Sequence, residues 1–252
     1  MKNPIERAVV LTLAALLSTS AWARNVKTRS VAPHPDATHW TYEGKKGPRF
    51  WGTLDPAFSL CKDGRGQSPI DITDTIPAPL QKLSPDFSPA KLKIAHHEHV
   101  ADELNNGHTI QVTYSEGDTL AIADTDYELV QFHFHGPSEH TVKGKRYPME
   151  MHVLHKSTSG ALAVVGVFIE RGAHNAAFDP IWSHLPAKKG VESHFEHVLV
   201  NVHDLLPHDT ASYRYVGSLT TPPCSEGVQW IVMKSPVQLS ARQIGQFTAL
   251  VK

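Results

Sequence analysis

Three histidines in two short segments are spaced so that they could share one metal ion. His133 and His135 lie two positions apart in the segment 129–135, and residues two apart on a β-strand point to the same face. The segment 149–155 repeats the design, with His152 on the face opposite to its methionines. Three neutral imidazoles hold a zinc ion with one coordination position left open, which is typical of catalytic zinc sites. The sequence therefore predicts a zinc-bound water that acts as a nucleophile near neutral pH.

Two further polar side chains are expected to support these ligands. Gln131 shares the face of His133, and Glu150 shares the face of His152. A metal-bound histidine usually donates its second ring N–H to an acceptor of this kind, which sets the tautomer and the orientation of the ring. We therefore expect Gln131 and Glu150 to orient two of the three ligands.

The same segment also allows a different metal site. His133, His135 and Glu139 follow the His-x-His-x(3,4)-Glu spacing of cupins, in which the carboxylate is a ligand and iron or manganese is a common metal. The glycine and the Pro-x-Gly-x-x-His sequence that accompany this spacing in cupins are not found at the corresponding positions. A cupin-type metalloenzyme is therefore the weaker alternative.

The elements that carry these residues are predicted to be strands of one large sheet. Short apolar or alternating runs, separated by Gly, Pro, Asn and Asp, are typical of antiparallel strands. Such runs cover residues 109–114, 129–135, 150–155, 162–169, 198–203 and 228–234. Short helical turns are expected near 179–184 and 240–249. The predicted fold class is mainly β, with a large, mostly antiparallel central sheet and a few short peripheral helices.

The first residues predict export. Lys2 and Arg7 are followed by an apolar run over 8–17 and by a small-x-small sequence at 21–23, which is the pattern of a signal peptide. The apolar run is too short to span a bilayer. We expect residues 1–23 to be the signal peptide, 24–38 a flexible leader, and 39–252 a single catalytic domain in the periplasm or outside the cell.

The charge balance argues against two classes of partner. The 24 basic and 25 acidic side chains give a net charge of −1, and loss of Lys2, Glu6 and Arg7 with the signal peptide changes it to −2. A nearly neutral chain has no strong field for nucleic acid or for an anionic membrane. We therefore expect neither as a partner after cleavage, while a homodimer is compatible with the sequence.

Two cysteines, Cys61 and Cys224, leave two alternatives open. An oxidising compartment favours a disulfide between them, and two buried, unreactive thiols are the other interpretation. A bridge that closes so long a loop would restrict the unfolded chain strongly.

A series of short motifs runs along residues 39–250. The motifs are, in order, His39-Trp40-x-Tyr42-x-Gly44, Gln67-Ser-Pro-Ile-Asp-Ile72, Asn105-Asn-Gly-His108, Gln131-Phe-His-Phe-His135, Ser138-Glu-His140, Glu150-Met-His152, Gly217-Ser-Leu-Thr-Thr-Pro-Pro223 and Trp230. This series resembles that of the α-class carbonic anhydrases, in particular their secreted bacterial branch. The resemblance implies a twisted sheet, a zinc cofactor on the three histidines, and reversible hydration of carbon dioxide to bicarbonate and a proton. Weak ester hydrolysis is an expected side activity of the same nucleophile.

The resemblance also implies roles for individual residues. Thr220 matches the hydroxyl that accepts a hydrogen bond from zinc hydroxide, and Glu139 matches the carboxylate to which this hydroxyl donates. The positions that match the apolar wall for carbon dioxide are Leu154, Val164, Leu219 and Trp230, with Thr221 as a polar neighbour of the bound water. The positions that match water-ordering residues of the cavity are Tyr42, Asn106 and Gln111.

A proton must leave the site in each turnover, and His108 matches the family's proton shuttle. An imidazole with a pKa near 6.5 can both accept and release a proton at working pH. The remaining histidines, including His96, His97 and His99, are expected to be solvated surface residues.

Further implications of the resemblance concern the backbone. The bonds Ser68–Pro69 and Pro222–Pro223 are expected to be cis, and Cys61 and Cys224 to be paired, as in bacterial members. The family normally continues after Phe247 through an Asn-x-Arg-Pro-x-Gln segment that forms a final strand and supports one metal-bound histidine, by position His135. This sequence ends at Lys252, so we expect either that it is truncated or that this support is missing.

A second function remains open at this stage. A non-catalytic binding domain of the same fold would also show most of these motifs. Such relatives usually lack one or more of the three histidines, all of which are present here. The sequence therefore favours the enzyme.

Overall fold

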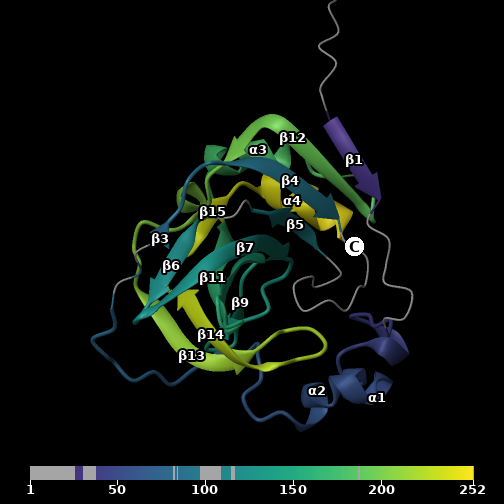
Figure 1. Cartoon of the computed structure of the whole chain (residues 1–252), viewed down its shortest axis with the longest axis vertical. Helices are drawn as coiled ribbons and strands as arrows, with labels where there is room; N and C mark the ends of the chain where they lie inside the picture. Colours follow the sequence, from purple (N-terminus) through teal and green to yellow (C-terminus); the bar gives the residue numbers. More distant parts are fainter. Residues whose placement is uncertain are drawn as a thin grey trace, which may run out of the picture.

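One large sheet forms the body of the protein (Figure 1). The structure is a computed structural model and describes residues 26–30, 38–81, 83, 85–96, 109–114, 117–186 and 188–251. The strands of the large sheet are β1 (Val26–Ser30), β3 (Pro85–Asp86), β4 (Ala90–His96), β5 (Ile110–Thr113), β6 (Thr119–Ile122), β7 (Thr125–His135), β10 (Met149–Ser157), β11 (Leu162–Arg171), β12 (Val191–Val200), β13 (Ser212–Ser218), β14 (Glu226–Met233) and β15 (Val237–Leu239). A small second sheet consists of β2 (Asp71–Ile72), β8 (Thr141–Val142) and β9 (Lys145–Arg146).

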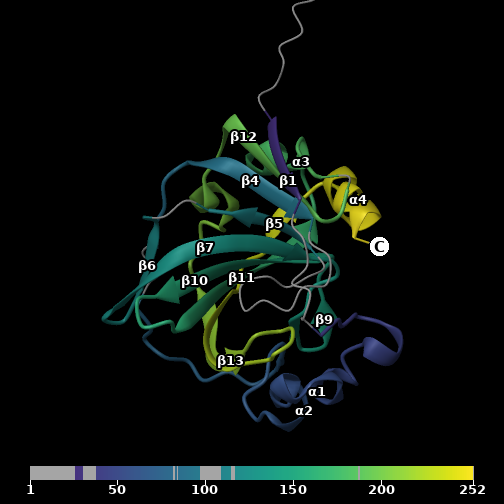
Figure 2. The same cartoon turned by 45° about the vertical axis from the view of Figure 1, so that its right-hand side comes forward.

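The helices are few and short. They are α1 (Trp51–Leu54), α2 (Leu60–Asp63), α3 (Asp179–Trp182) and α4 (Ala241–Leu250), with 3-10 turns η1 (Gly44–Lys46), η2 (Pro56–Phe58), η3 (Ala176–Phe178) and η4 (Val202–Leu205). In the two views, α3 and α4 lie near one end of the molecule and α1 and α2 near the other (Figures 1 and 2). None of the helices in the described ranges has the length and apolar character needed to cross a membrane.

The sheet is mostly antiparallel, as predicted. Its main path is β1-β12-β4-β5-β7-β10-β11-β14-β13, with β15, β3 and β6 attached beside it. Within this sheet, β14 and β15 pair with β11 in parallel, and the other described pairs are antiparallel. The predicted mainly β fold class is therefore confirmed.

The predicted strands agree with the observed ones except near 198–203. Strand β12 ends at Val200, and Asn201 then caps the 3-10 turn η4 by accepting a hydrogen bond from the backbone N–H of His203. The apolar run in this region therefore continues through a turn and not through a strand. The helix expected near 240–249 begins after Ser240, whose side chain forms a capping box with Gln243.

One short strand lies where the sequence predicts a flexible leader. Residues 26–30 form β1 and pair antiparallel with β12, with Val26 opposite Phe195. These five residues therefore differ from the prediction for 24–38. The signal peptide predicted for 1–23 lies outside the described residues.

The two faces of the central strands have different characters. Alternate residues of β7 and β10, including Phe132, Phe134, Met151 and Val153, belong to the main hydrophobic core. Phe247 of α4 packs into the same core and lies against Phe134, with ring centroids 6.0 Å apart. The opposite face of these strands carries the histidines, as their spacing predicts.

Candidate metal centre

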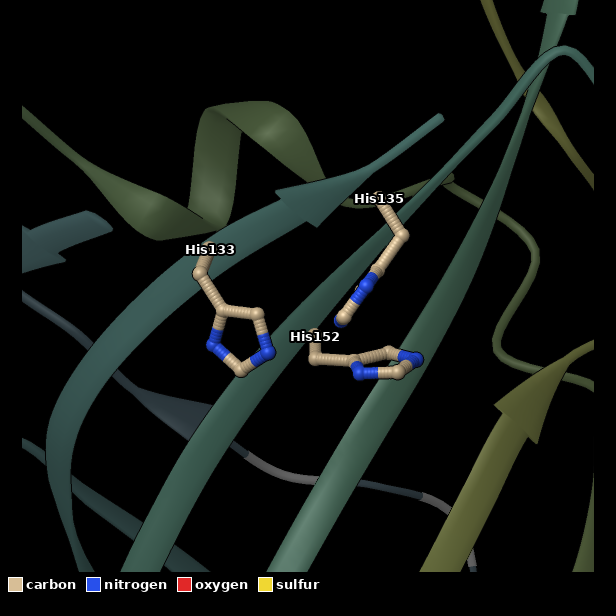
Figure 3. A group of neighbouring side chains, drawn as sticks. All are labelled: His133, His135 and His152. Atoms are coloured by element: carbon tan, nitrogen blue, oxygen red, sulfur yellow. The ribbon is translucent and has the colours of Figure 1, made fainter. Parts of the chain in front are cut away.

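Two neighbouring strands bring the three predicted ligands together. His133 and His135 stand near the end of β7, and His152 stands on β10 directly opposite His133 in the antiparallel register. The ring centroids are 5.0 Å apart for His133 and His135, 5.3 Å for His133 and His152, and 4.5 Å for His135 and His152. One ring nitrogen of each histidine lies within 4.8 Å of the others. Figure 3 shows the three side chains converging above these strands.

Hydrogen bonds orient two of the rings. Gln131 Oε1 lies 2.8 Å from His133 Nδ1, and Glu150 Oε1 lies 2.8 Å from His152 Nε2. A metal at the centre would therefore be bound through Nε2 of His133 and Nδ1 of His152. These are the contacts that the alternation of residues along each strand predicts.

The chemistry of the cluster fits a dication. Burial, together with the charge of His152, holds the pKa of His135 well below its usual range, so that this imidazole is in the neutral form that binds metals. Glu139 Oε2 is buried, has no hydrogen-bond partner among the described residues, and lies 3.4 Å from His135 Nε2 and 3.8 Å from His152 Nδ1. A buried carboxylate oxygen beside two of the three imidazoles lacks a neighbouring positive charge, and a bound divalent ion would supply it.

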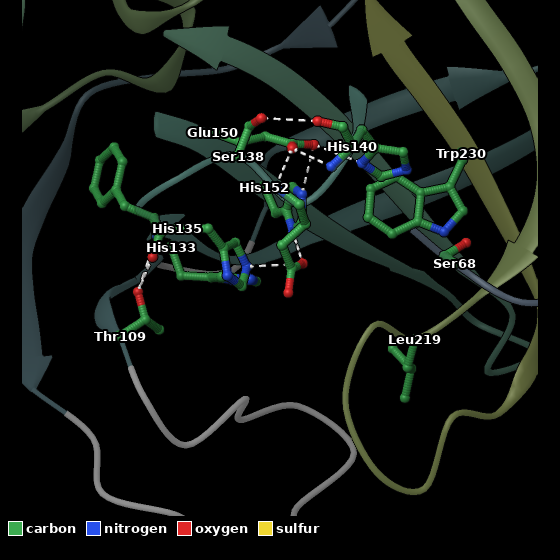
Figure 4. Close-up of polar contacts among 12 residues, drawn as sticks. Ser68, Thr109, His133, His135, Ser138, His140, Glu150, His152, Leu219 and Trp230 are labelled. Atoms are coloured by element: carbon green, nitrogen blue, oxygen red, sulfur yellow. Dashed lines mark hydrogen bonds and ion pairs between the residues drawn. The ribbon is translucent and has the colours of Figure 1, made fainter. Parts of the chain in front are cut away.

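Glu150 is the centre of a buried network behind His152 (Figure 4). Its Oε1 accepts hydrogen bonds from His152 Nε2 at 2.8 Å and from His140 Nδ1 at 2.7 Å. Its Oε2 accepts from the backbone N–H groups of Glu139 and His140, both at 2.9 Å. Burial alone would raise the pKa of this carboxyl, but the charge of His152 and these hydrogen bonds hold it well below its usual range.

The network continues away from the metal centre. His140 Nε2 lies 2.7 Å from the Tyr215 hydroxyl, which lies 2.8 Å from Ser68 Oγ. His140, Glu150 and His152 also have ligand atoms close enough for a metal. Their atoms are already hydrogen-bonded to one another, so this second group supports the first and is not a separate centre.

His140 and His155 correct the prediction that the remaining histidines are surface residues. Both side chains are fully buried. His155 stacks on Phe87, with ring centroids 5.7 Å apart, and burial lowers its pKa to about 4. His97 and His99 lie outside the described residues, and the side chain of His96 is not described.

Glu139 links the centre to the loop that follows β13. The Thr220 side chain hydrogen-bonds Glu139, and so does the hydroxyl of Tyr42. Burial raises the pKa of Glu139 to about 8, against the lowering effect of the Thr220 hydrogen bond. A dication nearby would favour the charged carboxylate.

Several contacts hold the 217–226 loop in place. Ser218 Oγ accepts from the backbone N–H of Ser68 at 2.8 Å, and Trp230 Nε1 donates to the Ser218 carbonyl at 2.9 Å. Glu226 Oε1 accepts from the backbone N–H of Gly66 at 2.6 Å and from Gln67 Nε2 at 3.1 Å. The loop is thereby attached to residues 66–68.

The predicted disulfide and cis bonds belong to the same region. A disulfide joins Cys61 to Cys224, which confirms the pairing. The bonds Ser68–Pro69 and Pro222–Pro223 are cis, as expected, and Gly136–Pro137 is a third cis bond that was not predicted.

An apolar wall stands beside the histidines. Leu154 of β10 is opposite Val164 of β11, and Val164 is opposite Trp230 of β14, so these side chains form one row across three strands. All three are buried in the second hydrophobic cluster, against which Leu219 packs from the loop. Thr221 is buried on the same loop.

Two of the predicted cavity residues can be placed. Gln111 of β5 is opposite His133 in the register, and its buried Oε1 has no hydrogen-bond partner in the described part of the chain. Tyr42 packs edge-on against Trp40 and Trp51. The predicted shuttle His108 and the predicted water-ordering residue Asn106 lie outside the described residues.

Comparison with known proteins agrees with this geometry. The model of the eukaryotic-type carbonic anhydrase family matches residues 46–252. A carbonic anhydrase from Pectobacterium carotovorum is 42% identical over 216 residues, which are 86% of this chain and 84% of that protein.

Solved structures agree as well. The α-carbonic anhydrase of Thermovibrio ammonificans, in complex with the inhibitor sulfanilamide, has a TM-score of 0.79 and 40% identity over 85% of this chain and 91% of that one. Dioscorin in complex with ascorbate has a TM-score of 0.73 and 28% identity over 84% of this chain and 88% of that one. The cupin alternative is therefore wrong, and the chain belongs to the eukaryotic-type, or α-class, carbonic anhydrase family.

Proposed function

We propose that this protein catalyses the reversible hydration of carbon dioxide to bicarbonate and a proton. The observation that carries the proposal is the convergence of His133, His135 and His152 beside the hydrogen-bonded pair Glu139 and Thr220. The three histidines would hold a zinc ion, which when bound supplies a hydroxide nucleophile near neutral pH; carbonic anhydrase itself is the standard example of this effect.

The pair Thr220 and Glu139 would aim the nucleophile. The Thr220 hydroxyl donates its hydrogen to the Glu139 carboxylate, so its oxygen can only accept a hydrogen bond from the nucleophile. That bond fixes the direction of the remaining lone pair, which must point at the carbon of the substrate. Orientation by a hydroxyl that cannot donate is the role that we assign to this pair.

The apolar wall would hold the substrate. Carbon dioxide carries no charge, and Leu154, Val164 and Trp230 offer it a surface without hydrogen-bond demands next to the histidines. Leu219 completes this wall from the loop. The polar side chains proposed to order water at the site are Thr221, Tyr42, Gln111 and Asn106.

The proton would leave through His108. An imidazole can accept a proton from water in the cavity and release it to buffer at working pH. We expect a His108→Ala variant to hydrate carbon dioxide more slowly and to recover when imidazole buffer is added. A rate that is unchanged in the variant would contradict this role.

Stopped-flow measurement of carbon dioxide hydration tests the proposed function. The mature protein should accelerate hydration, lose this activity with a zinc chelator, and recover it with added zinc while metal analysis shows one zinc per chain. His152→Ala should remove both the metal and the activity, because two imidazoles hold zinc poorly. His203→Ala, at an exposed histidine, is the matched control and should change neither. A folded, zinc-loaded protein without hydration activity would contradict the proposal.

We also propose that the protein is exported to the periplasm or beyond. The signal-peptide pattern of residues 1–23 supports this, and so does the disulfide between Cys61 and Cys224, because disulfides persist in oxidising compartments. Cell fractionation should recover the protein outside the cytoplasmic fraction, and N-terminal sequencing should show that the mature chain begins near Arg24. An uncleaved cytoplasmic product would contradict export.

A further inference from the structure

Strand β13 is one end of the large sheet. It pairs with β14, and no strand in the described ranges pairs with its other side. In an antiparallel pair, only alternate residues bond to the partner strand, so the remaining N–H and C=O groups of residues 212–216 point outwards. At the far end of the strand, the Ser218 N–H donates to Ser68 Oγ and the Ser218 carbonyl accepts from Trp230 Nε1. An open edge of this kind is a template for another extended chain.

A cleft of about 400 Å³ runs along the beginning of this edge. Ser212 and Arg214 of β13 line one side of it, and residues 78–81 line the other. In both views the segment that leads from α2 to β3 passes outside β13 (Figures 1 and 2). Pro77 and Pro79 have no backbone N–H, so this segment is poorly suited to fill the edge by pairing with it.

The cleft has two cations, Arg214 and Lys234, and the charge of Lys234 helps to lower the pKa of its one carboxylate, Asp209. Arg214 donates to the Gln81 carbonyl and to Ser212 Oγ, both of them neutral acceptors. Lys234 Nζ lies 4.9 Å from the centroid of the Tyr213 ring. Neither side chain forms an ion pair with any residue that the structure describes.

The acidic side chain of the cleft is already engaged. Asp209 accepts hydrogen bonds from the backbone N–H of Ala211 at 3.0 Å and from Ser235 Oγ at 3.0 Å. Beside these polar groups, Leu80 lines the cleft and is 49% exposed. The cleft therefore combines unpaired backbone groups, an excess of positive charge and an exposed apolar side chain.

We propose that this cleft binds an extended peptide strand of another protein, and that the strand carries a carboxylate side chain. Only an extended chain satisfies the outward N–H and C=O groups of β13 in register. Its carboxylate would form charge-assisted hydrogen bonds with Arg214 and lie near Lys234, and an apolar side chain would cover Leu80.

Two other occupants fit less well. A second copy pairing through β13 about a two-fold axis would bring the two Arg214 side chains into one antiparallel ladder, where like charges repel. A small anion would match the cations but leave the strand edge unpaired. Both are distinguished by the experiment below.

Fluorescence anisotropy with a labelled peptide tests the proposal on the full chain. The probe is a heptapeptide of alternating Thr and Val with one central Asp, and its analogue has Asn in place of Asp. Saturable binding with one peptide per chain is expected, about tenfold weaker for the analogue. Arg214→Gln should weaken binding of the Asp peptide by about the same factor, and Arg171→Gln, at an exposed position of β11, should not.

Hydrogen exchange gives the second measurement. A paired strand should slow exchange of the outward amides of residues 212–216, whereas an anion held by Arg214 alone would not. Carbon dioxide hydration by Arg214→Gln should equal that of the parent protein, which also shows that the variant is folded.

The proposal would be overturned by any of four results. The first is no binding at millimolar peptide, and the second is a loss of peptide affinity in Arg171→Gln equal to that in Arg214→Gln. The third is displacement of the peptide by inorganic phosphate at matched ionic strength. The fourth is a dimer of the protein, paired through β13, that the peptide dissociates. If the parent protein binds no peptide and Arg214→Gln aggregates, the charge of Arg214 serves only to prevent edge-to-edge aggregation through β13.

Discussion

The tautomers of the metal ligands depend on single acceptor atoms. Glu150 receives four N–H groups, two on each oxygen, and has no capacity to donate. This arrangement requires a carboxylate, because any donor at this position would face another donor. Glu150 should therefore be one of the residues that determine how tightly the centre holds its metal.

We predict that Glu150→Gln lowers zinc affinity about 10- to 100-fold, since the amide N–H₂ would meet two donors and release the ring of His152. Competition with a chromogenic chelator measures the change. Glu170→Gln is the control, because Glu170 lies near the end of β11, where its Oε1 accepts a hydrogen bond from Gln238 Nε2. Equal zinc affinity of Glu150→Gln and the parent would show that Glu150 does not orient His152.

His155 should make the protein sensitive to acid. Its pKa in the folded state is lowered to about 4 by burial, below its ordinary value of 6.5. The unfolded chain therefore binds the proton first, and the stability present above pH 6.5 is lost as the pH falls towards 4. The loss would amount to about 3 kcal/mol of unfolding free energy.

Urea unfolding at pH 7 and pH 4.5 measures this effect. His155→Leu should lose less stability over this interval than the parent, and His203→Leu, at an exposed histidine, should lose as much as the parent. The comparison of variants removes the contribution of the metal ligands, which titrate in all three proteins. An identical pH dependence in His155→Leu would contradict the prediction.

The ligand trio could be predicted from the sequence, whereas His140 and His155 were misjudged. His133, His135 and His152 share a recognisable period of two beside apolar neighbours, so their common face follows from strand geometry. A single histidine has no such pattern, and its burial depends on residues far along the chain, such as Tyr215 for His140 and Phe87 for His155. The motif Ser138-Glu-His140 contained the only sequence signal for His140.

At the scale of elements, the end of strand β13 and the helix α4 contain glycines in contrasting surroundings. A Cβ at Gly217 would lie 2.2 Å from Ser68 Oγ and 2.6 Å from Tyr215 Cε2. A Cβ at Gly245, inside α4, would have nothing within 4 Å. The same substitution should therefore have opposite effects at the two positions.

We predict that Gly217→Ala lowers the unfolding free energy by about 1 to 3 kcal/mol and slows carbon dioxide hydration, because it displaces the loop that bears Thr220. Gly245→Ala should raise stability by about 0.5 to 1 kcal/mol and leave hydration unchanged, because alanine restricts the unfolded chain and favours the helix. Urea unfolding and stopped-flow assays of both variants are the measurements. Two variants with the same behaviour would refute the close packing at Gly217.

Strands with a clear period were predicted, whereas the end of β12 and the strand β1 were not. The run at 198–203 is apolar enough for a strand. The Asn201 side chain, however, accepts a hydrogen bond from the backbone N–H of His203, and the strand ends at Val200. The strand β1 has no apolar pattern of its own, and its pairing with β12 comes from the neighbouring edge of the sheet. Asn201 was the local signal for the first outcome, and local composition carries none for the second.

For the whole molecule, the disulfide is the longest covalent link. Cys61 and Cys224 are 163 residues apart and fasten the helical region of α1 and α2 to the loop after β13. The order of strands in the sheet and the parallel pairing of β11 with β14 could not be predicted, because they depend on contacts between distant segments. The disulfide, the ligand trio and the contact of Thr220 with Glu139 were the long-range contacts that the sequence suggested.

We predict that Cys61→Ser combined with Cys224→Ser lowers the unfolding free energy by up to about 5 kcal/mol, since the unfolded chain gains the freedom of a long open loop. Urea unfolding of the double variant and of the oxidised parent measures the difference. The parent in reducing agent should behave like the variant. Unchanged midpoints in both would show that the link contributes no stability.

The opposition of His133 and His152 across β7 and β10 has a consequence for how the chain assembles. If these two strands slipped past each other by one residue, an aromatic or aliphatic side chain would stand where a ligand is needed. A metal ion would therefore bind only when β7 and β10 pair in the observed register, and its binding would stabilise that register over the shifted ones. Because the two strands are joined by a short connection, this stabilisation is expected early in folding, before the distant strands β13 and β14 close the sheet.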